Sequence, residues 1–331
     1  MTADRPRPPH RAATTLLTLG VPLLVVVTTV VVALSWGPRL PDPLAVHWSA
    51  ADVPDGFGSL AEAVAVPTLF VPLFAAGMWA LAFWVGRDTS TRRMAAGLTN
   101  GLAVLMAVVT LGGLRAQLDL PDAADATGVT PVIAWAFGAA IAVGVLVALL
   151  VPRTGPQPTT APVAPDAPRP PLAPTERAAW SMTVTSAAGA WVGGSAVLVT
   201  LATALVLRTY ALLVVPVALG ALVAATLVLR VTVDGRGLVA RSPLGWPSTR
   251  VPLDEVVAAR VVDIDPLTQF GGWGYRVGSG GRVGFVLRKG EGIEVERSGG
   301  RVTVVTVDDA ATGAALLNTL AERARAGRTT R

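Results

Sequence analysis

Six stretches of the chain are almost continuously apolar, and each is close to the roughly 20 residues that an α-helix needs to cross about 30 Å of hydrocarbon. They span approximately residues 14–36, 63–86, 94–114, 130–151, 183–206 and 211–229. The pattern therefore predicts a membrane α-helical protein with six transmembrane helices.

The first apolar stretch follows an arginine-rich start, as the core of a secretory signal peptide also does. Ala33-Leu34-Ser35 would pass as a signal-peptidase site. The apolar core from Ala12 to Leu34 is nonetheless longer than that of a signal peptide. We therefore expect an uncleaved first helix.

The loops between the apolar stretches differ in charge, which indicates the orientation of the chain. Arginines dominate the N-terminus and the second loop (Arg5, Arg7, Arg11, Arg87, Arg92 and Arg93), whereas the first loop is mainly acidic (Asp42, Asp52, Asp55 and Glu62). Because basic loops stay on the cytoplasmic side, we expect a multi-pass protein of the plasma membrane with both termini cytoplasmic. Arg208, in the short fifth loop, opposes this orientation. Four tryptophans lie near predicted helix ends, where we expect their side chains to lie among the lipid headgroups: Trp36, Trp84, Trp135 and Trp180.

A proline-rich segment interrupts the apolar pattern between residues 152 and 176. Its nine prolines forbid a helix and favour an extended, polyproline-like spacer. The segment divides the membrane part into a four-helix unit, residues 1–151 with an external loop at 37–61, and a two-helix hairpin, residues 177–230. Such a segment can also be a ligand for a partner domain, although a plain spacer is the simpler interpretation.

After Arg230 the pattern changes from continuous apolar to alternating, with short β-branched runs separated by glycine turns. Strands are predicted at 283–287, 293–296 and 302–307, followed by one helix with an apolar face made by Ala314, Leu317, Leu320, Ala321 and Ala324. Strands closed by a C-terminal helix resemble the pleckstrin-homology-like β-barrel of bacterial membrane proteins. The resemblance implies a cytoplasmic β domain over residues 231–326 whose helix is part of the core. The last residues, 327–331, are expected to be a disordered tail.

The composition agrees with a membrane protein and excludes functional sites that require cysteine. Hydrophobic residues make up 52% and charged residues 15% of 331 residues, and the mean hydropathy is +0.57. The chain has no cysteine, which excludes disulfides and thiolate sites. The pI near 10.8 comes from arginines beside apolar stretches. The expected partner is therefore the lipid bilayer and not nucleic acid.

The first external loop carries the most specific motif of the chain. Leu40-Pro41 is followed by His47-Trp48 and then by Pro54-Asp55-Gly56. This order resembles the LP…HW…PDG signature of a bacterial membrane family, domain of unknown function 1648, which also occurs in immunity and signalling proteins. The resemblance covers roughly residues 36–60 and, more loosely, the four-helix unit. It implies membership of a largely uncharacterised family, in which glycine is expected where this chain has Asp52.

Four residues of this loop, His47, Trp48, Asp52 and Asp55, form a candidate external binding site. In the functional interpretation, a histidine, the residue type that changes charge near neutral pH, lies beside carboxylates that are its partners or weak cation ligands. In the structural interpretation, Trp48 is an interface anchor and His47 bonds to backbone. Either arrangement has too few ligands for zinc. A polar site requires His47 within about 8 Å of one carboxylate.

The loop is also expected to fold back onto the outer ends of the first four helices. Its prolines reduce the entropy lost on ordering. Its apolar side chains are Leu44, Val46, Trp48 and Phe57, whose burial removes apolar surface from water. Trp48 should therefore be largely buried.

A second candidate site lies in the C-terminal region, where glycines surround aromatic and basic residues. Its residues are Trp273, Tyr275, Arg276, Arg288 and Lys289. The aromatic residues would pack on the strands or line the edge of a groove. The cations would face anionic lipid headgroups. The alternative is turn chemistry with solvated arginines. The glycines do not form a phosphate loop, because no Gly-Lys-Ser/Thr follows.

Ionisable residues do not occur in the central part of any predicted span, although pumps, coupled transporters and intramembrane aspartyl proteases need them. Serine-hydrolase, zinc-protease and dinucleotide-binding motifs are not found either. The sequence therefore predicts a non-enzymatic sensing or binding protein, without a cofactor, that links the external loop to a cytoplasmic docking domain. Two alternatives stay open. One is an envelope immunity or transport protein that protects against a toxic peptide, and the other is a membrane enzyme with an unrecognised site around His47 and Asp55.

Overall fold

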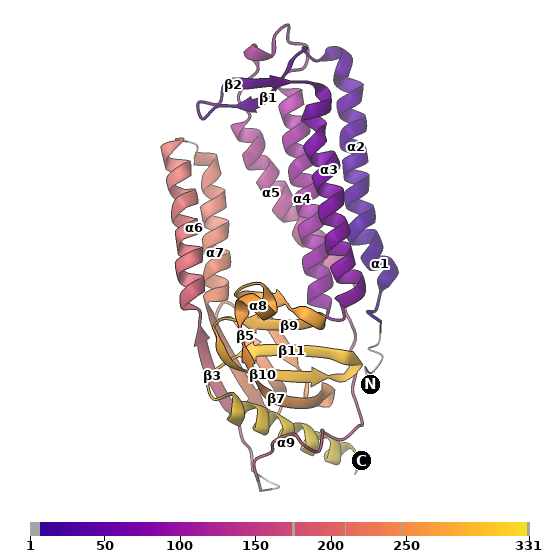
Figure 1. The fold of residues 1–331 in the computed structure, drawn as a ribbon, viewed down its shortest axis with the longest axis vertical. Helices are drawn as coiled ribbons and strands as arrows, with labels where there is room; N and C mark the ends of the chain where they lie inside the picture. Colours follow the sequence, from indigo (N-terminus) through magenta and orange to yellow (C-terminus); the bar gives the residue numbers. More distant parts are fainter. Residues whose placement is uncertain (1–6, 174–175, 209, 246, 330–331) are drawn as a thin grey trace. The chain divides into compact units, whose positions relative to one another are not determined.

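The computed structural model describes residues 7–173, 176–208, 210–245 and 247–329 (Figure 1). The chain divides into two compact units, which are described separately. Among the described residues, the helical unit lies within Pro8–Arg153 and Val199–Pro216, and the sheet unit consists of Arg7 and of residues within Thr154–Leu198 and within 217–329.

The helical unit is a bundle of apolar helices with a small β-hairpin between the first and second spans (Figure 1). Its helices are α1 (Arg11–Thr15), the π-helical turn η1 (Leu16–Gly20), α2 (Val21–Trp36), α3 (Leu60–Ala80), the π-helical turn η3 (Leu81–Val85), α4 (Thr89–Arg115) and α5 (Thr130–Leu150). The hairpin strands are β1 (Leu44–Trp48) and β2 (Pro54–Gly58). Short 3-10 turns lie at Gly37–Arg39 and Ala123–Asp125.

Five helices in the described part of the chain are long and apolar enough to cross a membrane. They are Arg11–Arg39, Leu60–Val85, Thr89–Arg115, Thr130–Leu150 and Gly189–Val206. The chain is a multi-pass membrane protein by helix length and composition. The sixth predicted span is shorter than expected, since α7 (Val214–Leu227) has 14 residues.

Glycines bring α4 and α5 into backbone contact. A Cβ atom on Gly97 would lie 3.0 Å from the carbonyl oxygen of Gly144, and a Cβ on Gly144 would lie 2.9 Å from that of Gly97. Close approach of this kind replaces the hydrophobic effect as the packing force between helices in lipid. Asn100, on α4, is buried and donates from Nδ2 to the Leu17 carbonyl oxygen at 2.7 Å, so it ties α4 to the first helix.

The sheet unit contains two sheets and a long C-terminal helix. The first sheet has the order β3-β4-β5-β6 and consists of β3 (Trp180–Thr185), β4 (Val228–Asp234), β5 (Gly237–Arg241) and β6 (Ser248–Val251). The second has the order β7-β10-β11-β9-β8 and consists of β7 (Val256–Ile264), β8 (Gly274–Val277), β9 (Arg282–Val286), β10 (Gly290–Arg297) and β11 (Arg301–Thr306). The helices are α8 (Pro266–Phe270) and α9 (Ala310–Thr329), with 3-10 turns at Leu253–Glu255, Ser279–Gly281 and Ser298–Gly300.

The two sheets and α9 share one hydrophobic core. Its buried members include Val231 and Leu238 from the first sheet, Ile293 and Val305 from the second, and Leu317 from α9. The prediction that the apolar face of the last helix is core is therefore confirmed. The helix continues to Thr329, beyond the point where a disordered tail was expected, and residues 330–331 lie outside the described residues.

The described strands of the sheet unit form two open sheets and not the closed pleckstrin-homology-like barrel that we expected. Pro252 and the 3-10 turn Leu253–Glu255 separate β6 from β7, and proline has no N–H to donate to a ladder. The alternating pattern located the strands, but it carries no information about which edges pair.

The first strand of the sheet unit, β3, precedes the helical hairpin in the sequence. It overlaps the start of the span that was predicted at residues 183–206. β3 pairs antiparallel with β4, from Trp180 opposite Val233 to Thr185 opposite Val228. The helices α6 (Ala187–Val206) and α7 are therefore inserted between two adjacent strands. Trp180 is not an interface anchor, because it is buried in the core and its Nε1 donates to Asp309 Oδ2 at 3.0 Å.

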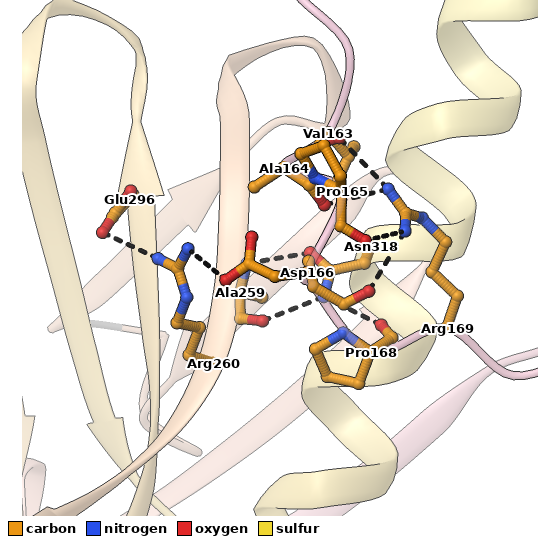
Figure 2. A network of polar contacts seen from close by, with 11 residues as sticks. Val163, Ala164, Pro165, Asp166, Pro168, Arg169, Ala259, Arg260, Glu296 and Asn318 are labelled. Atoms are coloured by element: carbon orange, nitrogen blue, oxygen red, sulfur yellow. Dashed lines mark hydrogen bonds and ion pairs between the residues drawn. The ribbon is translucent and has the colours of Figure 1, made fainter.

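The proline-rich segment is packed against the sheet unit and is not a free spacer (Figure 2). We call residues 154–173 the strap. Val163 is buried in the core of the sheet unit. The backbone N–H of Ala164 donates to the Val257 carbonyl at 3.2 Å. Asn318 of α9 donates from Nδ2 to the Pro168 carbonyl at 3.0 Å and also bonds both backbone groups of Ala259.

Two arginines complete the attachment of the strap. Arg169 folds back onto the strap carbonyls and pairs with Glu322 of α9 at 2.7 Å. Arg260 of β7 lies between Asp166 and Glu296, at 3.2 and 2.9 Å (Figure 2). Proline removes backbone donors, and the carbonyls of the strap accept from side chains instead. Arg169 of the strap bonds its N-terminal carbonyls, and side chains of α9 bond the later ones.

Candidate functional site

The loop between the first two spans, which the charge pattern predicts to be external, is an ordered hairpin of residues 44–58 that precedes α3 directly. Ser59 caps α3 with a capping box, because its hydroxyl accepts from the Glu62 N–H and the Glu62 carboxylate accepts from the Ser59 N–H. The strands pair with bulges around His47, where Gly56 lies opposite. A Cβ on Gly56 would lie 2.8 Å from that of His47. The glycine of the Pro-Asp-Gly motif is therefore needed for close strand approach.

Gln117 binds β1 to the end of α4. It is fully buried, and its side-chain amide forms both hydrogen bonds to Ala45, accepting from the N–H at 2.7 Å and donating to the carbonyl at 2.9 Å. Its Nε2 also donates to the Gly113 carbonyl at 3.0 Å. Sequence reasoning missed this residue. The available signal was an amide just beyond the predicted end of an apolar stretch, where a buried amide requires partners.

Asp52, in the turn of the hairpin, caps α5. Its Oδ1 accepts from the N–H groups of Val129 and Thr130 at 2.8 and 3.2 Å, where Val129 provides no side-chain cap of its own. A carboxylate there satisfies open N–H groups and faces the positive end of the helix dipole. Asp52 has a φ of 60°, which explains why the related signature has glycine here, and aspartate is among the few other residues that tolerate this region.

His47 and Asp55 form an exposed pair on the hairpin. Nδ1 of His47 lies 2.5 Å from Oδ1 of Asp55, and the two side chains are 70% and 46% exposed. The expected proximity of His47 to a carboxylate is confirmed. The pair does not include Asp52, whose carboxylate is bound to α5. The four candidate residues thus separate into a solvent-facing pair and two residues that fasten the hairpin.

Trp48 is half-buried, less than the sequence predicted. Its ring packs over Gly113 of α4. A Cβ atom added to Gly113 would lie 3.7 Å from the edge of the Trp48 ring. Among the expected apolar contacts, Leu44 is buried with Ala33 and Leu114, whereas Val46 and Phe57 stay 40% and 45% exposed. The hairpin therefore packs onto the helices through β1 and through Asp52 in its turn, and it leaves Val46 and Phe57 exposed.

The residues of the second candidate set contact separate partners. Tyr275 packs edge-on against Phe285, with ring centroids 4.9 Å apart, beside the core. Arg276 donates to the Trp273 carbonyl at 2.7 Å.

The other two cations of this set have carboxylate partners. Arg288 pairs with Asp308 at 2.5 Å and Lys289 with Asp265 at 2.9 Å. The hydrogen bond from Lys289 holds the pKa of the Asp265 carboxyl below its usual range, and the same contact raises the pKa of Lys289. These partners are acidic residues that the sequence analysis did not connect with the set.

The comparison with known families concerns the hairpin. Residues 23–71 match the family described as Domain of unknown function (DUF1648). This part of the chain is a DUF1648 domain. It comprises most of α2, the whole hairpin and the first half of α3. Gln117 and the start of α5, which hold the hairpin in place, lie outside the DUF1648 match. No curated protein and no solved structure matches the chain.

Proposed function

We propose that the chain is a non-enzymatic sensing and binding module of the plasma membrane. Its DUF1648 hairpin recognises a ligand outside the cell, and its sheet unit docks on a cytoplasmic protein or on inner-leaflet lipid. The observation that carries the proposal is the double attachment of the hairpin, to α4 through Gln117 and to α5 through Asp52. A ligand that shifts the hairpin would act on the ends of two membrane helices. The exposed pair of His47 and Asp55 offers it polar groups.

The pairing of β3 with β4 supports six membrane crossings. Because Thr185 lies opposite Val228, both ends of the intervening helical hairpin are on the same side of the bilayer. That arrangement requires an even number of crossings, so α6 cannot cross alone. A helix of 14 residues is about 21 Å long, and a span shorter than the hydrocarbon core is tolerated by local thinning of the bilayer. We infer that α7 completes the second crossing.

Cysteine labelling tests this topology cleanly, since the chain has no cysteine of its own. With both termini cytoplasmic, A50C in the hairpin and Y210C between α6 and α7 should react with a membrane-impermeant maleimide in intact cells. S279C in the sheet unit should react only after permeabilisation. The parent chain is the matched control. Labelling of S279C in intact cells would refute the orientation, and protection of Y210C would refute the sixth span.

The binding proposal is tested by photocrosslinking from the hairpin in growing cells. A benzophenone amino acid at Val53, which is 54% exposed, should give a discrete adduct with an extracytoplasmic molecule. H47A or D55N should reduce the adduct yield about tenfold, the effect of losing one charge-assisted hydrogen bond of roughly 1.5 kcal/mol.

Two controls make this result specific. D42N changes another exposed carboxylate of the same loop and should leave the yield unchanged. The same benzophenone at Leu69, which is 71% exposed on α3, should give lipid adducts only. Equal yields from the parent, H47A and D55N proteins would contradict the proposal. A peptide adduct together with survival of overexpressing cells against that peptide would favour immunity, and turnover of the captured molecule, abolished by H47A, would favour an enzyme.

A further inference from the structure

Two π-helical turns lie at one end of the helical unit. η1 interrupts the first helix and packs against α3 and α4, whereas η3 ends the α3 span and packs against α1. Side chains hold the first helix here, because Trp79 donates from Nε1 to Thr15 Oγ1 at 2.9 Å and Asn100 donates to the Leu17 carbonyl at 2.7 Å. Single π-turns inside helices occur frequently at functional sites.

A groove of about 560 Å³ opens on the surface beside these turns. Its lining includes Arg11, Leu16, Leu19, Gly20, Leu23 and Phe83. Ala12 and Thr15 complete the lining, in which Arg11 and Thr15 are the polar side chains and the others are apolar. From Arg11 to Leu23 the groove follows the first span over about 18 Å of helix. The hydrocarbon of one leaflet is about 15 Å thick, so the groove is long enough to hold an acyl chain of one leaflet.

Arg11 carries a positive charge at the mouth of this groove. Its guanidinium carbon lies 3.5 Å from the centroid of the Phe83 ring and 6.0 Å from that of Trp84, so cation–π contacts hold it in place. The Nε atom of Arg11 is buried, and this atom has no hydrogen-bond acceptor among the residues that the structure describes. Arg11 is the first residue of the first candidate span. A residue at this position lies at the depth of the lipid phosphates.

We propose that the groove binds an anionic phospholipid of the surrounding leaflet, with its phosphate on Arg11 and one acyl chain along Leu16, Leu19 and Leu23. Guanidinium groups match phosphate geometry with paired hydrogen bonds, and Phe83 orients the guanidinium for that contact. The charge at the mouth and the apolar length behind it together fit a lipid and not a soluble anion. The site is separate from Arg288 and Lys289, whose charges are paired with carboxylates.

Native mass spectrometry of the delipidated full-length protein, titrated with dioleoyl phosphatidylglycerol or dioleoyl phosphatidylcholine, tests the proposal. The parent protein should prefer phosphatidylglycerol about fivefold, as expected for one arginine near a membrane surface worth about 1 kcal/mol. R11Q should lose this preference but keep binding phosphatidylcholine, and R11K should retain part of the preference.

A second variant tests the apolar part independently of the charge. G20L should fill the groove and weaken binding of both lipids, and it should be accommodated because an added Cβ lies 3.3 Å from the flexible tip of Leu16. R115Q, at an exposed position on the last turn of α4, is the matched control and should bind as the parent does. An unchanged preference in R11Q, an equal loss in R115Q, or displacement of phosphatidylglycerol by inorganic phosphate at the same concentration would overturn the proposal.

Discussion

Replacing Glu255 by glutamine should lower the free energy of unfolding of the sheet unit by about 3–5 kcal/mol, the range found when one partner of a buried ion pair is removed. Glu255 is 3% exposed. Its Oε2 accepts from Arg297 Nη2 at 2.6 Å and lies 2.9 Å from Arg301 Nη2. Its Oε1 accepts from the Gln157 N–H of the strap at 2.9 Å. Glutamine keeps the shape but removes the charge that two buried guanidinium groups share.

The same contacts give this prediction a pH dependence. Burial alone would raise the pKa of Glu255, but the hydrogen bonds from Arg297 and Gln157 and the charges of Arg297 and Arg301 outweigh it and lower the pKa below 4.5. A lowered pKa in the folded state means that the carboxylate stabilises the fold above the ordinary glutamate pKa. This stabilisation is lost as the pH falls through the folded-state value. The difference in the free energy of unfolding between the parent protein and E255Q should therefore be largest at pH 7 and decrease at acidic pH.

Hydrogen exchange of β7 and β10 in the purified full-length protein measures this effect. E322Q is the control, since its partner Arg169 and Glu322 itself lie nearer the surface and such pairs contribute about 1 kcal/mol or less. If E255Q and E322Q exchanged at equal rates at pH 7, the buried cluster would not stabilise the unit as argued.

Leu317→Asp should unfold the sheet unit altogether. Leu317 is fully buried on α9 within the shared core. The change removes a large apolar side chain, which costs about 2–5 kcal/mol, and adds a carboxyl group without a partner, which costs several kcal/mol more. The total is comparable with the whole stability of a typical domain, about 5–15 kcal/mol.

Limited proteolysis of the full-length protein in lipid nanodiscs would reveal the result of Leu317→Asp. Cleavage should spread through residues 228–329 while the helical unit stays protected, because the helical unit has hydrophobic clusters of its own. A311D, at an exposed position in the first turn of α9, should resemble the parent protein. Resistance of L317D to cleavage would mean that α9 is not required for the sheets.

The sequence predicted those features that depend on neighbouring residues. Continuous apolar runs located the five candidate spans, alternation located β9, β10 and β11, and the eight-residue separation of His47 and Asp55 within one loop made their contact foreseeable. The Ser298-Gly299-Gly300 turn joins β10 to β11, between the strands predicted at 293–296 and 302–307.

The features that sequence reasoning missed depend on distant partners. Asp52 caps a helix 77 residues away, and Gln117 pairs with a strand 72 residues away. The position of Gln117 just beyond an apolar stretch marked it as an amide that needs partners, but nothing local identifies the partner in either case. β3 was missed because Trp180–Thr185 precedes an apolar helix without a break in the pattern. The strap was read as a spacer because prolines indicate an extended backbone but do not show what it packs against.

The insertion of α6 and α7 between β3 and β4 also suggests a route to a water-soluble form of the sheet unit. Thr185 and Val228 are the last opposed residues of an antiparallel pair, so a two-residue turn such as Asn-Gly would close them into an ordinary β-hairpin. Removing residues 186–227 in this way, with the chain begun at the strap, would keep strands β3 to β11, α9 and the Glu255 cluster. A truncation that simply started at residue 231 would lack Trp180 and the strap, and would expose the core that they cover.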